Sequence, residues 1–250
     1  QHTTPGVAIG AWEYQLATGD MLFMRERIWP ILRGVAEWIE SRGVFTPQGF
    51  EFHFMVGPAE QIRNVSNPSY FNLSARLAMD AALNCARQLG IRAPRSWEKV
   101  SKSIYLPMNR HKKVVLPYEP GTAIRRSDSI RGAFSEAIAG MSDHAYPLGN
   151  LQLLLVHGCP VPDEVFRNTF LHEEPIRLGR GPDPGVPGSS EAPSFTSPPY
   201  AASAAFCGDR RKARDLFVNS WKPYRLHPYW MASKYQGGER RGCLTGSGSL

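Results

Sequence analysis

SYFNLSARLAMDAALNCARQLG, residues 69–90, is the stretch of this chain with the clearest helical pattern. Its apolar side chains recur at the period of an α-helix that buries one face. Gly90 follows the last periodic residue, at the position where glycine commonly ends a helix. We therefore expect a long helix over these residues that ends at Gly90.

Two further helices are expected before this stretch. Residues 5–18 have helical spacing and begin with proline near the first turn. Gly19 and Asp20 are typical of a helix end and of the cap of the next helix. That next helix covers residues 21–43, where Pro30 either kinks the helix or marks its true first turn.

In the rest of the chain, predicted helices again follow one another, and the predicted strands are only short connections between them. Phenylalanines alternate in residues 49–57, which predicts a short strand, and residues 112–118 look extended. Because regular buried strands are absent, a parallel α/β fold is excluded and a mainly α array or toroid of helices is predicted. The remaining expected helices are residues 94–105, 163–174, 197–208 and 209–221.

Composition indicates a packed protein rather than a disordered one. The chain has 250 residues, of which 42% are hydrophobic and 20% charged, enough for one large domain or two small ones, and we expect residues 1–250 to be a single fragment of one domain. Glycine, proline and serine dominate residues 178–194, which predicts a long loop. The sequence has neither an initiator Met nor a signal-peptide pattern. Residue 1 lies just before an apparent helix and residue 250 lies inside an apolar stretch, so we expect the remainder of the protein's own chain beyond both ends. The localisation is left open, with the cytoplasm slightly favoured over secretion.

Charge and cysteine content exclude several classes of partner. The net charge is +7, but the basic residues are scattered rather than arranged in a stripe with aromatic residues, so no nucleic-acid partner is expected. No apolar run approaches the roughly 20 residues that span a membrane, so no membrane partner is expected either. The four cysteines are widely spaced, which excludes a compact zinc site, and no cofactor is predicted.

A polar segment directly before the long helix is the candidate for chemistry. FMVGPAEQIRNVSNPSYFN, residues 54–72, places the single carboxylate of Glu60 behind a Gly-Pro turn and among amides. A polar loop with a helix cap is the ordinary interpretation. Asparagine, glutamine and tyrosine, however, also satisfy sugar hydroxyls, because they donate or accept hydrogen bonds as required. In such a cleft, a carboxyl group with a raised pKa acts as general acid on a glycosidic oxygen.

This segment resembles the catalytic loop of glycoside hydrolase family 65, which includes maltose, kojibiose and trehalose phosphorylases and acid trehalases. Residues 57–72 align without a gap to the family pattern GPDEYHENVDNNAYTN, and the family's general acid falls on Glu60. Weaker similarity runs over most of the chain and is strongest at residues 11–90 and 195–250. The matching residues are Gly57, Pro58, Glu60, Asn64, Val65, Asn67, Tyr70 and Asn72, and the departing ones include Ala59, Gln61, Ile62, Arg63, Ser66 and Pro68.

The resemblance implies a mainly α fold, an (α/α)6 barrel of the six-hairpin glycosidase type that is incomplete at both ends. It also implies a carbohydrate substrate. Trp230, in the loop HPYWMAS, is a candidate for stacking on a sugar ring. The residues expected to bind substrate are His2, Gln61, Asn64, Asn67, Tyr70, Asn72, Trp230 and Lys234.

The same resemblance bears on the type of reaction. The family's phosphorylases hold phosphate with a Lys-Gln pair, and the corresponding region here, YPLGNLQLLL, lacks it, which favours hydrolysis. An inverting hydrolase needs a second carboxylate to activate water. Lys234 stands where hydrolytic relatives are expected to have Glu, and Glu239 is the nearest carboxylate. Glu239 is either the general base or a surface residue paired with Arg240 or Arg241.

Three functions remain open at this point. The first is an inverting glycoside hydrolase that acts on an α-linked glucoside such as trehalose, with Glu60 as acid and Glu239 as base. The second is a carbohydrate-binding protein of the same fold without catalysis, which Lys234 suggests. The third is a disaccharide phosphorylase.

Overall fold

The structure is a computed structural model of the chain, and it divides into two compact units. The first unit consists of Gln1–Pro107 and Leu116–Ser129, and the second of Met108–Val115 and Ile130–Leu250. Each unit is described by itself. The described residues are 1–56, 62–120, 124–125, 161–177, 197–222, 225–226 and 231–232.

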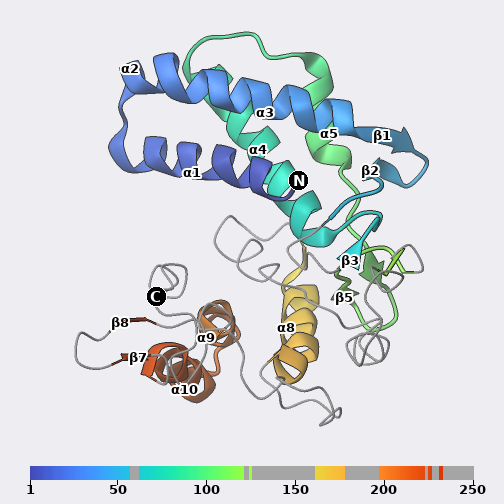
Figure 1. Cartoon of the computed structure of the whole chain (residues 1–250), viewed down its shortest axis with the longest axis vertical. Coiled ribbons are helices and arrows are strands. Elements are labelled where there is room, and N and C mark those ends of the chain that lie inside the picture. The colour runs from blue at the N-terminus through green and yellow to red at the C-terminus, as the bar shows by residue number, and fades with distance from the viewer. Residues whose placement is uncertain are drawn as a thin grey trace. The chain divides into compact units, whose positions relative to one another are not determined.

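The first unit is a small helical body with one β-hairpin (Figure 1). Its elements are α1 (Thr3–Thr18), α2 (Met21–Phe23), the π-helical segment η1 (Met24–Ile28), α3 (Trp29–Arg42), β1 (Gly43–Thr46), β2 (Gly49–Phe52), β3 (Ile62–Arg63), α4 (Ser69–Gln88), α5 (Arg95–Ser103) and β6 (Ile124–Arg125). The predicted helices over residues 5–18, 69–90 and 94–105 are therefore confirmed.

Helix α4 is the centre of this unit. It packs against α1, α3 and α5, and Figure 1 shows it crossing behind α1 and α3. Alanines occupy many of its buried positions, and small side chains allow neighbouring helices to approach on more than one face. Phe71 near its first turn and Met79 in its middle are fully buried, so the core of the unit surrounds this helix.

The connection between α1 and α3 contains the helix end at Gly19 and the helix cap at Asp20 that the sequence predicts. Gly19 has φ 66° at the end of α1, a left-handed conformation that glycine adopts without strain. The Asp20 side chain accepts a hydrogen bond from the Phe23 N–H at 2.9 Å, and so caps the next helix. Pro30 lies in the first turn of α3, directly after η1. Because proline has no N–H to donate to the preceding turn, the wider π-helical turn before it is an expected accommodation.

The expected strand over residues 49–57 is wrong beyond Phe52. β2 pairs antiparallel with β1 only from Gly49 to Phe52, in the register Gly43↔Phe52 to Thr46↔Gly49. Phe54 has φ 56° and is 74% exposed, so the chain leaves the sheet there. A left-handed residue breaks the extended geometry on which the alternation of phenylalanines depends.

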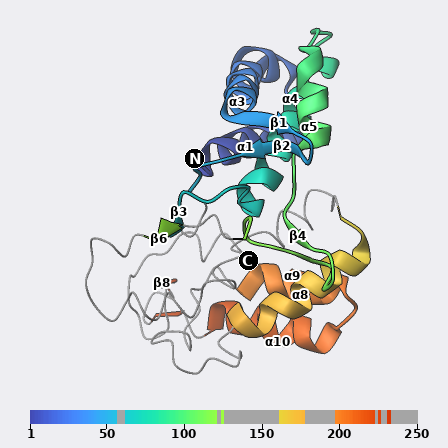
Figure 2. The same ribbon diagram turned by 90° about the vertical axis from the view of Figure 1, so that its right-hand side faces the viewer.

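The described part of the second unit consists of three helices and short strands. Helix α9 packs against α10, and α8 packs against α9 (Figure 2). Phe166 and Phe170 of α8 are fully buried, and its Thr169 hydroxyl accepts a hydrogen bond from the Val115 N–H at 3.0 Å. The elements are β4 (Met108–Asn109), β5 (Val114–Val115), α8 (Asp163–Arg177), α9 (Ser197–Phe206), α10 (Arg210–Trp221), β7 (Arg225–Leu226) and β8 (Met231–Ala232).

The predicted mainly helical class is thus confirmed, and the strands form only two-stranded ladders within the described parts. The predicted loop over residues 178–194 lies outside the described residues, and the single domain over residues 1–250 stays a prediction. Among the helices described, none combines the length and apolar character needed to cross a membrane.

Candidate active site

The candidate site is built around residues 57–61, the segment that contains Glu60. These residues lie outside the described part of the chain, and the described backbone on both sides of them is hydrogen-bonded. Met55 and Val65 exchange backbone hydrogen bonds of 2.9 and 3.1 Å. Immediately after the segment, β3 pairs antiparallel with β6. The two chain ends that enter and leave residues 57–61 are therefore held by backbone pairing.

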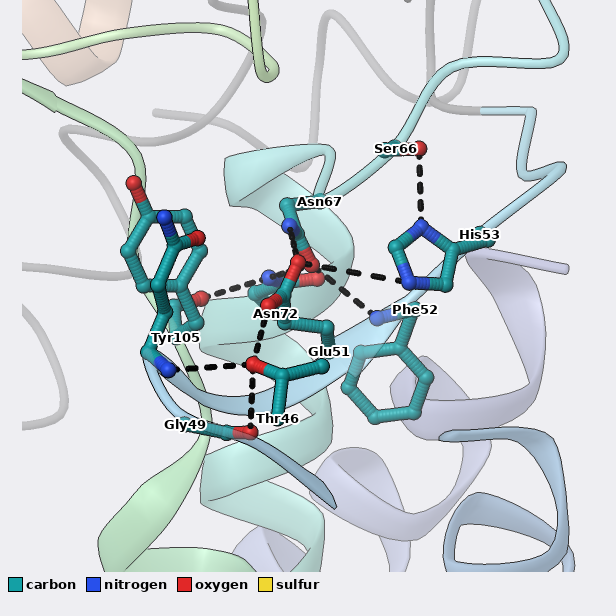
Figure 3. A network of polar contacts seen from close by, with 10 residues as sticks. Thr46, Gly49, Glu51, Phe52, His53, Ser66, Asn67, Asn72 and Tyr105 are labelled. Atoms are coloured by element: carbon teal, nitrogen blue, oxygen red, sulfur yellow. Dashed lines mark hydrogen bonds and ion pairs between the residues drawn. The ribbon is translucent and has the colours of Figure 1, made fainter. Parts of the chain in front are cut away.

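A buried carboxylate lies next to this pairing. Glu51, in the middle of β2, is only 7% exposed. Its Oε2 accepts a hydrogen bond from Asn67 Nδ2 at 2.8 Å, and its Oε1 accepts one from the Thr46 hydroxyl (Figure 3). Because a buried carboxylate is costly without partners, these two donors are what allow Glu51 to lie here.

The turn of the hairpin places Thr46 for this contact. Gly49 has φ 147°, and a Cβ added to it would lie 2.5 Å from the Ser103 carbonyl oxygen at the end of α5. Only glycine therefore fits this approach. The Thr46 hydroxyl also accepts from the Gln48 N–H at 3.1 Å. Its single proton is directed to the Glu51 carboxylate, a stronger acceptor than the Gly49 carbonyl, which lies 3.3 Å away.

Asn67 links β2 to the chain that leads into α4. Its backbone N–H donates to the Phe52 carbonyl at 2.8 Å, and its side-chain Oδ1 accepts from the Phe52 N–H at 3.0 Å. Its Nδ2 faces Glu51, so both ends of the amide have an assigned partner and the orientation of the group is fixed. The residue is completely buried and has φ 52°. Asparagine tolerates this left-handed conformation better than most residues.

Asn72 extends the network into α4. Its Nδ2 donates to the Tyr105 carbonyl at 2.6 Å and lies 3.5 Å from Asn67 Oδ1. The residue is 1% exposed, and its Oδ1 has no hydrogen-bond partner among the described residues. The chain before α4 is therefore tied to the segment that follows α5.

A third segment crosses the start of α4. Ser69 donates its backbone N–H and its hydroxyl to the Pro117 carbonyl at 2.9 and 3.2 Å, and the Glu119 N–H donates to the Ser66 carbonyl at 2.9 Å. The Ser66 hydroxyl lies 2.9 Å from His53 Nδ1, and His53 Nε2 lies 4.0 Å from Glu51 Oε2. Residues from four separate stretches of sequence therefore meet around the ends of the 57–61 segment.

The predicted substrate-binding residues that the structure describes differ in burial and in their partners. Asn67 and Asn72 are brought together and turned toward protein partners, whereas Asn64 is exposed with φ 56°. The His2 ring lies edge-on to the Tyr70 ring, with centroids 6.2 Å apart. Burial raises the pKa of Tyr70, which keeps its hydroxyl neutral at ordinary pH. Sugar contacts by these residues stay predictions.

Five of the predicted site residues lie outside the described part of the chain. They include both candidate catalytic carboxylates, and their roles stay predictions. Among the described residues, no group of three or more potential ligands for a metal ion is present. The five are Glu60, Gln61, Trp230, Lys234 and Glu239.

Sequence reasoning missed a buried acidic group among the described residues near the site. Glu51, with its partner Thr46, was not among the expected site residues. The available signal was the single charged residue in the otherwise apolar run GFEF, where phenylalanine directly precedes and directly follows Glu51. In a strand with both faces covered, such a residue is buried and needs partners, and the nearby asparagines were candidates.

Comparison with known proteins shows which family the chain resembles. The model of the glycosyl hydrolase family 65 central catalytic domain matches residues 1–129. Kojibiose hydrolases from Flavobacterium johnsoniae and Mucilaginibacter mallensis are 26% and 22% identical to the chain, and each alignment covers 100% of this chain and 32% of the relative. A kojibiose phosphorylase from Escherichia coli is 33% identical over 36% of this chain and 12% of its own length. The chain thus spans about a third of the length of the curated hydrolases it matches.

A solved structure shows the same fold. It comes from the human microbiome, is provisionally named a kojibiose phosphorylase, and superposes with a TM-score of 0.58 at 13% sequence identity. The superposition covers 87% of this chain and 34% of that one. The helical elements described above are accordingly part of an (α/α)6 barrel. With the family model matching more than half of its residues, the chain belongs to glycosyl hydrolase family 65 and carries part of that family's central catalytic domain.

Proposed function

We propose that the complete protein is an inverting glycoside hydrolase that cleaves an α-linked glucosyl disaccharide. The observation that carries this proposal is the extent of the similarity. The two kojibiose hydrolases match the whole chain, whereas kojibiose phosphorylases from Caldanaerobacter subterraneus and Escherichia coli match 47% and 36% of it. Kojibiose is therefore the first substrate to test and trehalose the second.

In this proposal Glu60 is the general acid. Its proton passes to the glycosidic oxygen as the bond from that oxygen to the anomeric carbon breaks, and water attacks the anomeric carbon from the opposite face. A second carboxylate, about 6.5–9.5 Å from the first, accepts the proton of that water. Glu239 is assigned this role. The products are β-glucose and the released sugar, because attack from the opposite face inverts the α configuration.

The hydrogen bonds of the described residues on both sides of residues 57–61 support this role for Glu60. A proton donor contributes most when it is held in one geometry, because the cost of orienting it is then met before the reaction. Backbone pairs of Met55 with Val65 and of β3 with β6 lie on the two sides of residues 57–61. The asparagines after the segment are held by buried hydrogen bonds. This surrounding structure is suited to a segment that carries a catalytic carboxyl group.

The test uses the full-length protein with kojibiose and then trehalose, with and without added phosphate. We expect glucose at the same rate in both conditions, with the β anomer appearing first by NMR. Glu60→Gln should lower kcat by at least about 100-fold, because it keeps the side chain's size but removes the proton. Phosphate-dependent release of glucose 1-phosphate, or near-normal turnover of an unactivated disaccharide by Glu60→Gln, would overturn the proposal.

The general base is tested separately. Glu239→Ala should abolish hydrolysis of kojibiose if Glu239 activates water. A second candidate function, carbohydrate binding without catalysis, is favoured by one observation: Lys234 stands where a family glutamate is expected. In that case the wild-type protein should bind kojibiose without cleaving it, and Lys234→Glu should introduce turnover. An active wild type excludes the second candidate, and a fully active Glu239→Ala variant excludes Glu239 as base.

A further inference from the structure

We propose that Glu51 is a positioning residue, whose buried carboxylate anchors the chain on both sides of residues 57–61. The part of this inference that concerns catalysis rests on the proposed function, and the anchoring itself does not. Neither Glu51 nor Thr46 belongs to the segment that resembles the family's catalytic loop. The argument comes from the hydrogen bonds around Glu51.

The first step is that Glu51 is held as a fixed acceptor. The side chain is 7% exposed and lies in β2, whose backbone is paired with β1. One carboxylate oxygen accepts from the Thr46 hydroxyl and the other from Asn67 Nδ2 at 2.8 Å. Hydrogen bonds to a buried charged acceptor are stronger than neutral ones, and breaking one leaves a costly unpaired group. Glu51 therefore restrains Asn67 more firmly than a neutral side chain would.

The second step is that Asn67 passes this restraint to the backbone. It makes two hydrogen bonds with the backbone of Phe52, one through its N–H and one through its Oδ1. Together with the contact to Glu51, these bonds hold a residue whose φ is 52°, a conformation that costs free energy for most side chains. Without Glu51, the Nδ2 donor of Asn67 would be completely buried without its charged acceptor, which is unfavourable.

The third step is where these residues lie along the chain. Phe52 precedes Met55 by three residues, and Asn67 follows Val65 by two. The Met55–Val65 pair therefore lies directly beyond the Phe52–Asn67 pair, on the side of residues 57–61. Figure 3 shows Asn67, Asn72 and Tyr105 together with the side chains of Glu51 and Thr46. Glu51 thus joins β2, which leads toward residues 57–61, to Asn67, which lies between those residues and α4.

The consequence for catalysis concerns turnover more than binding. A general acid works only within a small range of positions, and a misplacement of about 1 Å can cost about 100-fold in rate. Loosening the anchor should displace the proton donor in the transition state, which lowers kcat, and leave contacts with the bound sugar, which govern KM, largely intact. A general loss of stability would lower the amount of folded enzyme without such a split.

The test compares variants in the full-length protein. Glu51→Ala removes both acceptors, whereas Glu51→Gln keeps one carbonyl oxygen for Asn67 and an amide that the Thr46 hydroxyl can accept from. Asp80→Ala is the matched control, because Asp80 also accepts a hydroxyl hydrogen bond, from Ser101, in the same unit but away from residues 57–61 in sequence. The readouts are kcat and KM for kojibiose and the hydrogen exchange of backbone amides.

We expect Glu51→Ala to lower kcat about 100-fold with KM within about threefold, and Glu51→Gln to recover activity to within about tenfold of wild type. Exchange of the Val65 and Asn67 amides should accelerate at least about tenfold in Glu51→Ala, while core amides such as that of Met79 change little. Asp80→Ala should show neither the kcat loss nor the local acceleration.

Two results would overturn the proposal. One is unchanged exchange at Val65 and Asn67 in Glu51→Ala, and the other is a uniform acceleration that Asp80→Ala reproduces. If the wild-type protein cleaves no sugar, the proposed function fails. Hydrogen exchange of the Val65 and Asn67 amides in Glu51→Ala still shows whether Glu51 anchors the chain. If Glu51→Ala does not fold, Asn67→Gly removes the hydrogen bond to Glu51 together with the one from the Phe52 N–H and still permits the positive φ, and the same exchange criteria apply to it.

Discussion

Replacing Asn67 by aspartate changes one atom of the buried network and should have a large, pH-dependent effect. In Asn67→Asp, the Oδ1 that accepts from the Phe52 N–H remains, but the Nδ2 that donates to Glu51 becomes an oxygen. Two carboxylates then face each other at a completely buried position. The change in volume is negligible, so the effect is electrostatic.

The magnitude follows from the 2.8 Å distance between Asn67 Nδ2 and Glu51 Oε2. At an effective dielectric constant of about 20, two unit charges about 3 Å apart repel by roughly 5 kcal/mol. Protonating one carboxyl avoids this repulsion, and at pH 7 this costs about 4 kcal/mol for an ordinary carboxyl pKa near 4. Protonation is the cheaper route, so we expect Asn67→Asp to lower the free energy of unfolding by about 3 to 4 kcal/mol at pH 7.

The direction of the pH dependence is also fixed. The folded variant keeps a proton that the two separate carboxyls of the unfolded chain release, so the folded pKa of the pair is raised. The variant should therefore regain stability relative to wild type as the pH falls from 7 to 5, by up to about 1.4 kcal/mol per pH unit.

Urea denaturation at pH 7 and pH 5, followed by circular dichroism, measures both effects. Asn84→Asp is the control for the same chemical change, because Asn84 Oδ1 accepts from Arg87 on the surface of α4 and the added charge is favourable there. A loss in Asn67→Asp that is equal at the two pH values, or no larger than in Asn84→Asp, would refute the reasoning.

Two further predictions concern other described residues. Phe54→Gly should be about 1 kcal/mol more stable than Phe54→Ala in urea denaturation, because both lose the same exposed ring but only glycine relieves the strain at φ 56°; equal stability would contradict the strain. Burial raises the pKa of Cys85 to about 11, so only about one thiol in a thousand is a thiolate at pH 8. Iodoacetamide, followed by peptide mass spectrometry, should therefore leave Cys85 unlabelled until the protein is unfolded, and rapid labelling of the folded protein would contradict this.

The helices could be predicted because their signals are local. The apolar period of residues 69–90 and the glycine after it determine α4, and Gly19 with Asp20 determines the turn between α1 and α2. Pro30 marks a first turn, which is one of the two alternatives that the sequence left open, but the π-helical turn before it was not predicted. Met24 and Ile28, at the two ends of that turn, are both buried in the core.

The parts of the site that sequence could not supply depend on distant contacts. The segment that carries Glu60 was recognised from its own residues and their family resemblance. The burial of Glu51 depends on Thr46 and Asn67, which lie on different segments, and no local pattern pairs them. Phe54 continues the alternation of the strand before it, yet tertiary structure turns it out of the sheet. Propensity in strands is easily overridden in this way.

The crossing of the 116–120 segment over the start of α4 has a consequence for the order of folding. Ser69 contacts Pro117, and Ser66 contacts Glu119, about fifty residues later in the chain. A ribosome adds about 5–20 residues per second. Helix α4 therefore leaves it several seconds before the 116–120 segment that binds its first turn. During that interval the helix can form without these contacts, so the residues just before α4 are more exposed to chaperones in the nascent chain than in the folded unit.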